Sequence, residues 1–259
     1  MLKQVFVSTA VYALAHSLGM QGALDEVARQ CKEPNRESLP VVRTITRLAN
    51  LCEVGLHVDG GATYIGMMRS RAFHEAYKSG LPGWITLDDD IECTHATAWA
   101  MLEALDDPLP RIVLCPYMMR LPDAINRIAL TVPTIRIERS FPIERDAFKI
   151  EREGTGGERV REQVKLIELP KGHGGGMGMV GMNRRAMEEI VQAAPPEIKW
   201  FDSDGVEKLA LFFERLEDCL WWGEDTSFFK WRVPATVTVE ALLVGTVSHG
   251  GIPLDLSKL

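Results

Sequence analysis

Three adjacent carboxylates, Asp88, Asp89 and Asp90, follow an apolar run that begins at Trp84. If a strand continues through them, its side chains alternate between faces, and Asp88 and Asp90 project to the same side. Two carboxylates on one face repel each other at neutral pH, which favours a divalent cation between them. The alternative is a polar turn after a buried strand, with one Asp helping to cap the next helix.

A glycine-rich run at 172–178 is the second candidate, because Gly176, Gly178 and Gly181 formally match the dinucleotide-binding fingerprint. A Pro-Lys pair separates this run from the preceding predicted strand, which disfavours a dinucleotide site. The run also lacks the Gly-Lys-Ser/Thr ending of a phosphate loop, which argues against an ATPase. We expect instead that Gly176 and Gly178 let the backbone approach a ligand more closely than a Cβ atom would allow.

Two more sets of polar side chains could take part in chemistry. Glu224 and Asp225 open a predicted helix after a Trp-Trp-Gly turn. They either stabilise the start of that helix, or one of them acts as general base toward an acceptor hydroxyl. His249 follows the last predicted strand and precedes two glycines. An isolated His is often structural, but an imidazole beside carboxylates suits Mn²⁺ or Mg²⁺ bound to a diphosphate.

The elements that must position these residues predict an α/β fold. Strand-like and helix-like runs alternate along the chain, which implies crossover connections and a mainly parallel sheet between helices. Ligands bind beyond the carboxyl ends of such strands, so Asp59 and the three Asp residues could face one crevice. The strand-like runs are 4–10, 55–59, 84–91, 111–115, 164–169 and 235–244, and the helix-like runs are 17–29, 41–51, 64–78, 95–105, 184–193 and 226–231.

Composition narrows the class of protein. The chain has 259 residues and a net charge of -7, which argues against a protein that coats nucleic acid. Its five scattered cysteines favour free thiols in a reducing compartment over a disulfide framework. We find no signal-peptide pattern and no apolar run long enough to span a bilayer, so we expect a cytoplasmic protein without a membrane partner. A charged loop insertion is expected at about 136–165.

Taken together, these residues resemble glycosyltransferases of the GT-A fold, of the family-2-like kind. The Met-Arg-Ser-Arg-Ala run at 68–72 and the run at 85–91 resemble the Arg-containing helix and Asp-x-Asp strand of that family. Residues 176–184 resemble its glycine strand and following helix, and residues 222–229 resemble its Glu-Asp motif. Residues 247–249 look like its late His. The Gln-x-x-Arg-Trp signature of processive synthases is absent, which favours a single addition.

The resemblance implies a single compact domain and a metal-dependent transfer of a sugar from a nucleotide-diphosphate donor, a UDP-sugar above all, to an acceptor hydroxyl. Residues 1–115 would form the nucleotide-sugar-binding half and residues 116–259 the acceptor-binding half. Mn²⁺ or Mg²⁺ would be held by Asp88, Asp90 and His249, and the base would be Asp225 with Glu224 beside it. The nucleotide sugar would contact Thr9, Asp59, Arg71, Asp88, Asp89, Gly176 and Gly178.

Two questions stay open at the level of the sequence. A degenerate GT-A module that binds a nucleotide or a partner without turnover would keep the three Asp residues but would not need Glu224, Asp225 or His249; their presence together favours an enzyme. The acceptor cannot be read from the sequence. Residues 111–165 carry 11 Lys and Arg against 8 Asp and Glu, which permits a nucleic-acid acceptor such as a hydroxymethylated DNA base. Saccharide, protein and small-molecule acceptors are equally open.

Overall fold

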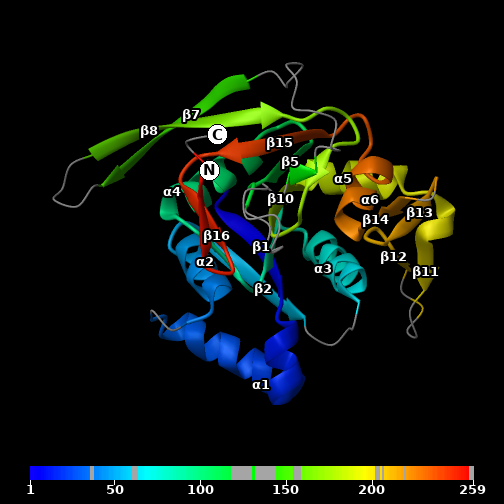
Figure 1. The fold of residues 1–259 in the computed structure, drawn as a ribbon, viewed down its shortest axis with the longest axis horizontal. Helices are drawn as coiled ribbons and strands as arrows, with labels where there is room; N and C mark the ends of the chain where they lie inside the picture. Colours follow the sequence, from blue (N-terminus) through cyan, green and yellow to red (C-terminus); the bar gives the residue numbers. More distant parts are fainter. Residues whose placement is uncertain are drawn as a thin grey trace.

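The computed structural model describes residues 1–35, 38–59, 64–117, 130–131, 144–153, 159–201, 205, 207–218 and 220–256. In this part of the chain the central sheet has eight strands in the order β2-β1-β3-β10-β5-β15-β8-β7. β10 and β8 run against the other six strands. The predicted α/β class, with a mainly parallel sheet flanked by helices, is confirmed (Figure 1).

The bounds of the elements follow the alternation seen in the sequence. The strands of the central sheet are β1 (Gln4–Ala10), β2 (Glu53–Asp59), β3 (Gly83–Asp88), β5 (Arg111–Leu114), β7 (Glu144–Glu153), β8 (Arg159–Glu168), β10 (Met179–Asn183) and β15 (Thr238–Leu243). The helices are α1 (Tyr12–Lys32), α2 (Pro40–Ala49), α3 (Ile65–Ser79), α4 (His95–Leu105), α5 (Arg184–Ala193), the 3₁₀ turn η1 (Pro196–Ile198) and α6 (Glu224–Trp231).

In the ranges that the structure describes, short strands form four further small sheets. β4 (Ile91–Cys93) pairs with β16 (Thr246–His249), which also pairs with β17 (Ile252–Asp255). The other pairs join β6 (Leu130–Thr131) to β9 (Gly174–Gly175), β11 (Lys199–Phe201) to β12 (Glu207–Leu209), and β13 (Arg215–Glu217) to β14 (Leu220–Trp222). The sheet of β4, β16 and β17 sets His249 opposite Ile91, three residues after the end of β3.

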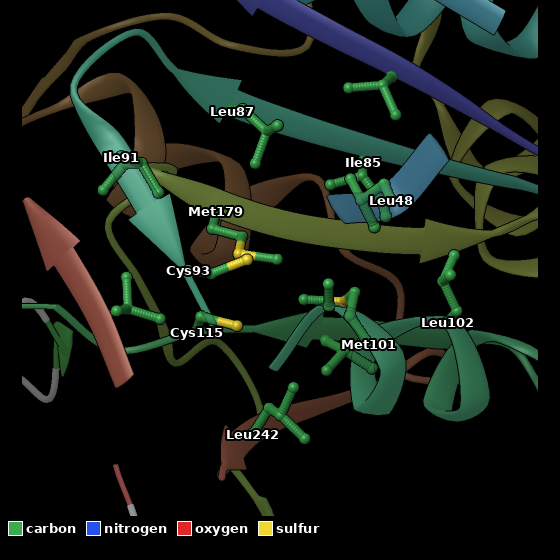
Figure 2. Packing of buried hydrophobic residues seen from close by; sticks show 14 of the residues in the cluster. Leu48, Ile85, Leu87, Ile91, Cys93, Met101, Leu102, Cys115, Met179 and Leu242 are labelled. Carbon is green, nitrogen blue, oxygen red and sulfur yellow. The ribbon is translucent and has the colours of Figure 1, made fainter. Parts of the chain in front are cut away.

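The middle strands β3, β10, β5 and β15 are buried on both faces, which explains the nearly continuous apolar runs in them. Side chains alternate between two cores: in β3, Trp84 belongs to one core and Ile85 to the other. α1, α2 and α4 cover the face of Ile85, and α3, α5 and α6 cover the face of Trp84 (Figure 1). Figure 2 shows the core that contains Ile85, where Leu48 of α2 and Met101 of α4 lie over the strands.

Two helix ends are set by local signals that the sequence displays. The Asn183 side chain caps α5, because its Oδ1 accepts a hydrogen bond from the backbone N–H of Ala186 at 3.0 Å. α3 ends at Gly80, whose φ of 73° is a left-handed conformation that glycine adopts without strain. The bounds of α5 agree with the predicted helix, and those of α3 differ from the prediction by one residue at each end.

The structure corrects the expected continuation of the acidic strand. β3 ends at Asp88, Asp89 and Asp90 form a turn, and the next strand, β4, belongs to a different sheet. Simple alternation therefore does not place Asp88 and Asp90 on one face, because a strand's period of two ends where the strand ends. Part of the polar-turn interpretation is thus correct, although the cap of α4 is Thr94 rather than an Asp.

Two segments contribute more strands than the sequence suggested. Residues 179–183 form β10, a central strand between β3 and β5, which is not among the strand-like runs found in the sequence. Its Gly181 lies so close to Leu105 and Met101 of α4 that a Cβ would meet both at 2.7 Å. The predicted loop insertion at 136–165 overlaps β7 and β8, and residues 136–143 and 154–158 lie outside the described residues. Because charged residues are frequent in this stretch, the sequence did not reveal the alternation of side chains that is typical of a strand.

Two predictions from composition can be compared with the described residues. Within them, no helix has both the length and the apolar character that crossing a membrane requires. Cys31, Cys52, Cys93 and Cys115 are free thiols, as their scattered positions predicted. Cys219 lies outside the described residues.

Candidate functional site

The carboxyl ends of three neighbouring strands bring two predicted residues to one edge of the sheet. Asp59 ends β2 and Asp88 ends β3, and both are in register with Ala10 at the end of β1. The predicted placement of Asp59 and the acidic triplet at a shared edge is therefore observed. In α/β sheets this edge is where ligands bind.

A buried guanidinium, that of Arg69 in α3, joins two sequence motifs at this edge. Arg69 Nη2 donates a hydrogen bond to Asp88 Oδ1 at 2.9 Å, and Nη1 donates one to Glu224 Oε1 at 2.5 Å. The Arg69 side chain is 7% exposed, against 24% for Asp88 and 14% for Glu224. The Asp triplet and the Glu-Asp pair, far apart in the sequence, thus meet at one side chain. Sequence reasoning chose Arg71 and missed Arg69.

The charges around Arg69 do not balance. Burial raises the pKa of Glu224, and the charges of Asp225 and Asp88 raise it further, while Arg69 lowers it. Burial alone would lower the pKa of Arg69, but Asp88 and Glu224 outweigh that effect and hold this pKa above its ordinary value. One guanidinium therefore faces Asp88 and Glu224, and the charge of Asp225 also acts on it. The surplus of negative charge favours the approach of a cation.

Glu224 and Asp225 are placed by the start of α6. This helix follows Gly223, and both carboxylates stand in its first turn, where the helix dipole favours negative charge. Asp225 Oδ1 also accepts a hydrogen bond from the backbone N–H of Thr226 at 2.6 Å. The two side chains thus have the helix-end position expected for them. The role of Asp225 as a base stays a prediction.

The third acidic residue, Asp90, lies beside His249. The pairing of β4 with β16 sets His249 opposite Ile91, and the backbone N–H of Gly250 donates a hydrogen bond to the carbonyl of Asp90 at 3.0 Å. His249 Nε2 lies 3.4 Å from Asp90 Oδ2. The structure therefore brings together two of the three predicted metal ligands, whereas Asp88 faces Arg69.

Asp90 and His249 suit a metal ion that shares its ligands with a substrate. They do not suit an ion that protein side chains hold alone. Among the described residues, no group of three or more His, Cys, Asp or Glu side chains has the spacing to hold a metal ion. Mg²⁺ and ions like it are nevertheless often bound through one or two protein ligands together with substrate phosphates. The oxygen of Asp90 and the imidazole of His249 fit an ion that shares its ligands with a diphosphate. The prediction of Mn²⁺ or Mg²⁺ stays a prediction.

Tyr117 is a residue of this site that sequence reasoning missed. Its ring centroid lies 4.7 Å from that of His249, and its buried phenol packs so closely on Gly176 and Gly178 that a Cβ at either glycine would collide with it. The glycines were predicted to let a ligand approach the backbone, and in the structure the group that packs on them is Tyr117. Burial, followed by the charge of Asp88, raises the pKa of Tyr117, which keeps its hydroxyl protonated. Contact of the glycines with a donor sugar remains a prediction.

Residues predicted to hold the nucleotide lie toward β2. Arg71 Nη2 lies 2.8 Å from Asp59 Oδ2, so these two predicted residues form an ion pair. Thr9 of β1 is buried, and its hydroxyl finds no hydrogen-bond partner among the described residues. Asp89 contributes its carbonyl, which accepts a hydrogen bond from the N–H of Val41 at 3.4 Å. A hollow of about 110 Å³ beside Arg71 is lined by Tyr64, Met67, Ser70, Arg71, Lys208, Leu209, Ala210, Phe212 and Phe213.

Comparison with known proteins leaves the family open. No protein-family model and no curated protein sequence matches the chain. Among solved structures, that of A197 from STIV aligns with a TM-score of 0.45 and 12% identity, covering 96% of this chain and 85% of that one. A sucrose-bound protein from Bacillus anthracis, described as a glucose-1-phosphate thymidylyltransferase, aligns with a TM-score of 0.36 and 10% identity over 100% of this chain and 93% of that one.

A mannose-1-phosphate geranyltransferase from Thermus thermophilus aligns with a TM-score of 0.31 and 12% identity over 93% of this chain and 74% of that one. TM-scores and identities this low do not carry a functional argument. The function is therefore argued from the geometry of the site.

Proposed function

We propose that this protein is a glycosyltransferase that moves a sugar from a nucleotide-diphosphate donor, a UDP-sugar first of all, to an acceptor hydroxyl in a single addition. The observation that carries the proposal is the convergence of Asp88 and Glu224 on Arg69 at the carboxyl edge of the sheet. Sugar transfer needs a donor-binding group and a base within a few ångströms of each other. Asp88 is the proposed donor-binding group, and the pair Glu224-Asp225 contains the proposed base.

The proposed roles of the side chains follow from their contacts. Glu224 is held by Arg69, so Asp225 is the better candidate to accept the proton of the acceptor hydroxyl. Tyr117 is protonated and lies beside His249, so it can donate a hydrogen bond to a ligand oxygen. Asp90 and His249 would hold Mn²⁺ or Mg²⁺, which neutralises charge on a leaving diphosphate when it is bound.

The donor's nucleoside would lie toward the ends of β1 and β2. Asp59 and Arg71 offer an acceptor and a donor of hydrogen bonds there, and the hydroxyl of Thr9 is buried close by. The acceptor is unspecified. A hydroxymethylated DNA base is one proposal for it, and strong weakening of duplex binding with rising salt would support that choice.

A donor screen tests the proposal. Sugar nucleotides are added to the protein with and without Mn²⁺, thermal unfolding is followed, and the hits are assayed for release of the nucleoside diphosphate. We expect at least one UDP-sugar to raise the unfolding temperature and to turn over, and Asp90→Ala and Asp225→Asn to slow that turnover. Asp218→Asn, an exposed change on the β13–β14 hairpin, is the matched control.

Each outcome of the screen has a clear meaning. Unchanged turnover in both Asp90→Ala and Asp225→Asn would remove the assigned roles. Binding of UDP-sugars without any hydrolysis or transfer would favour a nucleotide-binding module without turnover. The absence of any stabilising sugar nucleotide would overturn the proposal as a whole.

A further inference from the structure

A hollow of about 110 Å³ lies beside helix α3, and the proposed transfer leaves it without a role. Helix α3 and the residue before it form one wall, and residues from the stretch 208–213, which begins in β12, form the other. The lining side chains are mostly apolar or aromatic. An apolar cavity of about 150 Å³ is large enough to hold benzene, so this hollow has the size for a single ring.

Hydrogen bonds and ring contacts fix both walls of the hollow. The backbone N–H of Phe212 donates a hydrogen bond to Ser70 Oγ at 3.1 Å, and the Phe212 ring stacks on that of Phe228 with 4.5 Å between the centroids. The hydroxyl of Tyr64 accepts a hydrogen bond from the backbone N–H of Glu214 at 2.7 Å. A ligand therefore does not have to order these rings when it binds. Aromatic rings prefer stacked or edge-to-face contacts with one another, which favours a planar ring as the occupant.

The charges of the lining are both positive. Arg71 and Lys208 line the hollow, and within the described part of the chain no acidic residue does. An ion pair fixes the guanidinium of Arg71, whose Nη2 lies 2.8 Å from Asp59 Oδ2. The Nε of Arg71 is buried and has no hydrogen-bond partner among the described residues. A hydrogen bond from a guanidinium to an anion is stronger than one to a neutral oxygen, so the lining favours a negatively charged ligand.

We infer that this hollow binds a small molecule made of one planar ring and one anionic group, a carboxylate or a phosphate. The ring lies against the aromatic side chains, and the anion lies toward Arg71 and Lys208. A sugar ring fits less well, because apolar walls leave its hydroxyls without hydrogen bonds. The inference does not rest on the proposed function, since Arg71 is the one residue that the hollow shares with the site proposed for the donor.

The test follows the NMR signal of the Met67 methyl group in the full chain, with benzoate as the probe. Met67 lines the hollow, its side chain is half exposed, and Met67→Leu identifies its signal. We expect benzoate and phenyl phosphate to shift this signal until it saturates, and the ratio of their affinities shows which anion the hollow prefers. Benzyl alcohol, which lacks the charge, should bind about three- to fivefold more weakly. Acetate, which lacks the ring, and benzylamine, which carries a positive charge, should not bind.

Three variants locate the binding. Lys208→Met should weaken the binding of benzoate by about three- to fivefold and leave that of benzyl alcohol unchanged. Ala210→Leu fills the hollow and should abolish the binding of both. Lys199→Met is the matched control, because it removes a lysine from the neighbouring strand β11 that does not line the hollow. It should bind benzoate as the wild type does. If Ala210→Leu does not fold, the comparison of the two lysine variants still decides.

The outcomes separate this inference from the proposed function. Benzylamine that binds as tightly as benzoate, benzoate that does not shift the Met67 signal, or equal affinities of Lys208→Met and Lys199→Met for benzoate would each overturn the inference. If UDP with Mn²⁺ shifts the Met67 signal and displaces benzoate, the hollow belongs to the nucleotide site, so the inference fails and the proposed function stands. If benzoate binds as expected but no sugar nucleotide stabilises the protein, the proposed function fails and the inference stands.

Discussion

Two buried guanidinium groups lie at opposite ends of the central sheet, and each is held by two carboxylates. Arg69 contacts Asp88 and Glu224 at the carboxyl end of β3. Arg111 starts β5, and its Nη1 lies 2.9 Å from Glu240 Oε1 while its Nε lies 2.7 Å from Asp107 Oδ2. The side chains of Arg111 and Glu240 are only 5% and 1% exposed.

The difference between the two clusters lies in access and in surplus charge. Glu240 is buried within β15, and Arg111 with its two carboxylates ties β15 to β5 and to the turn before it. Around Arg69, both carboxylates are partly exposed, and Asp225 adds a further negative charge. The comparison teaches that a buried arginine alone does not mark a functional site. An accessible edge with unbalanced charge is the stronger sign.

The largest expected effect is on turnover. Asp225→Asn removes the proposed base, and we expect the rate of donor turnover to fall by about 10²–10⁴-fold, the usual contribution of such a group. The free energy of unfolding should change by no more than about 1 kcal/mol, the size of a helix-dipole interaction.

Asp107→Asn, in the cluster around Arg111, is the matched control for this change. It should lower the free energy of unfolding by about 1–3 kcal/mol, because it removes a negative charge that faces the buried guanidinium of Arg111, and leave turnover unchanged. Both quantities are measured on each variant by a kinetic assay and by urea denaturation. Equal losses of turnover in the two variants would erase the distinction between the clusters.

The second effect is on stability. Arg111→Met removes the positive charge that lies 2.9 Å from the buried carboxylate of Glu240, and we expect the free energy of unfolding to fall by about 3–5 kcal/mol. Lys199→Met breaks a more exposed pair with Glu207 and should cost less than about 1 kcal/mol. Urea denaturation measures both. A small cost for Arg111→Met would show that its cluster is not the structural one.

Much of this architecture was predictable from the sequence, because periodicity and helix-end signals are local. The order of strands and helices, the cap at Asn183 and the edge that holds Asp59 and Asp88 all follow from such signals. The central position of β10 was not predictable in this way. It depends on pairing between β3 and β5, which are separate in the chain.

The site was predictable as a set of motifs but not as a set of contacts. Arg69 and Arg71 stand two residues apart on one helix, so they point in different directions, and spacing alone does not say which one meets Asp88. In the structure, Asp88 forms an ion pair with Arg69, and Asp59 forms one with Arg71. Tyr117 follows β5 without any motif of its own. The glycines that it packs against were the only signal that a bulky group lies there.

A third, smaller effect on the free energy of unfolding should distinguish Gly176, which lies in the site, from Gly181, which lies in the core. Gly176→Ala should clash with the hydroxyl of Tyr117, and Gly181→Ala with Leu105 and Met101, each costing about 1–3 kcal/mol of unfolding free energy. Removing the hydroxyl by Tyr117→Phe should reduce the first cost and leave the second unchanged. A double-mutant cycle measured by urea denaturation checks this. An equal cost of Gly176→Ala with and without the hydroxyl would contradict the packing described.

The smallest effect is expected at Thr9. Its buried hydroxyl finds no partner among the described residues, so Thr9→Val should leave the free energy of unfolding unchanged or raise it by up to about 1 kcal/mol. If the hydroxyl serves the nucleotide, the same variant should bind UDP several times more weakly. Calorimetry with UDP and Mn²⁺ measures this, and a loss of stability larger than the loss of binding would assign Thr9 to the core.

The most direct test of the account is a crystal structure of the protein with UDP and Mn²⁺. We predict that the diphosphate and the ion lie at the carboxyl edge of the sheet, between Asp90 with His249 on one side and Arg69 on the other. Nucleotide bound elsewhere on the molecule, or a structure in which Asp88 and Glu224 do not meet at Arg69, would contradict it.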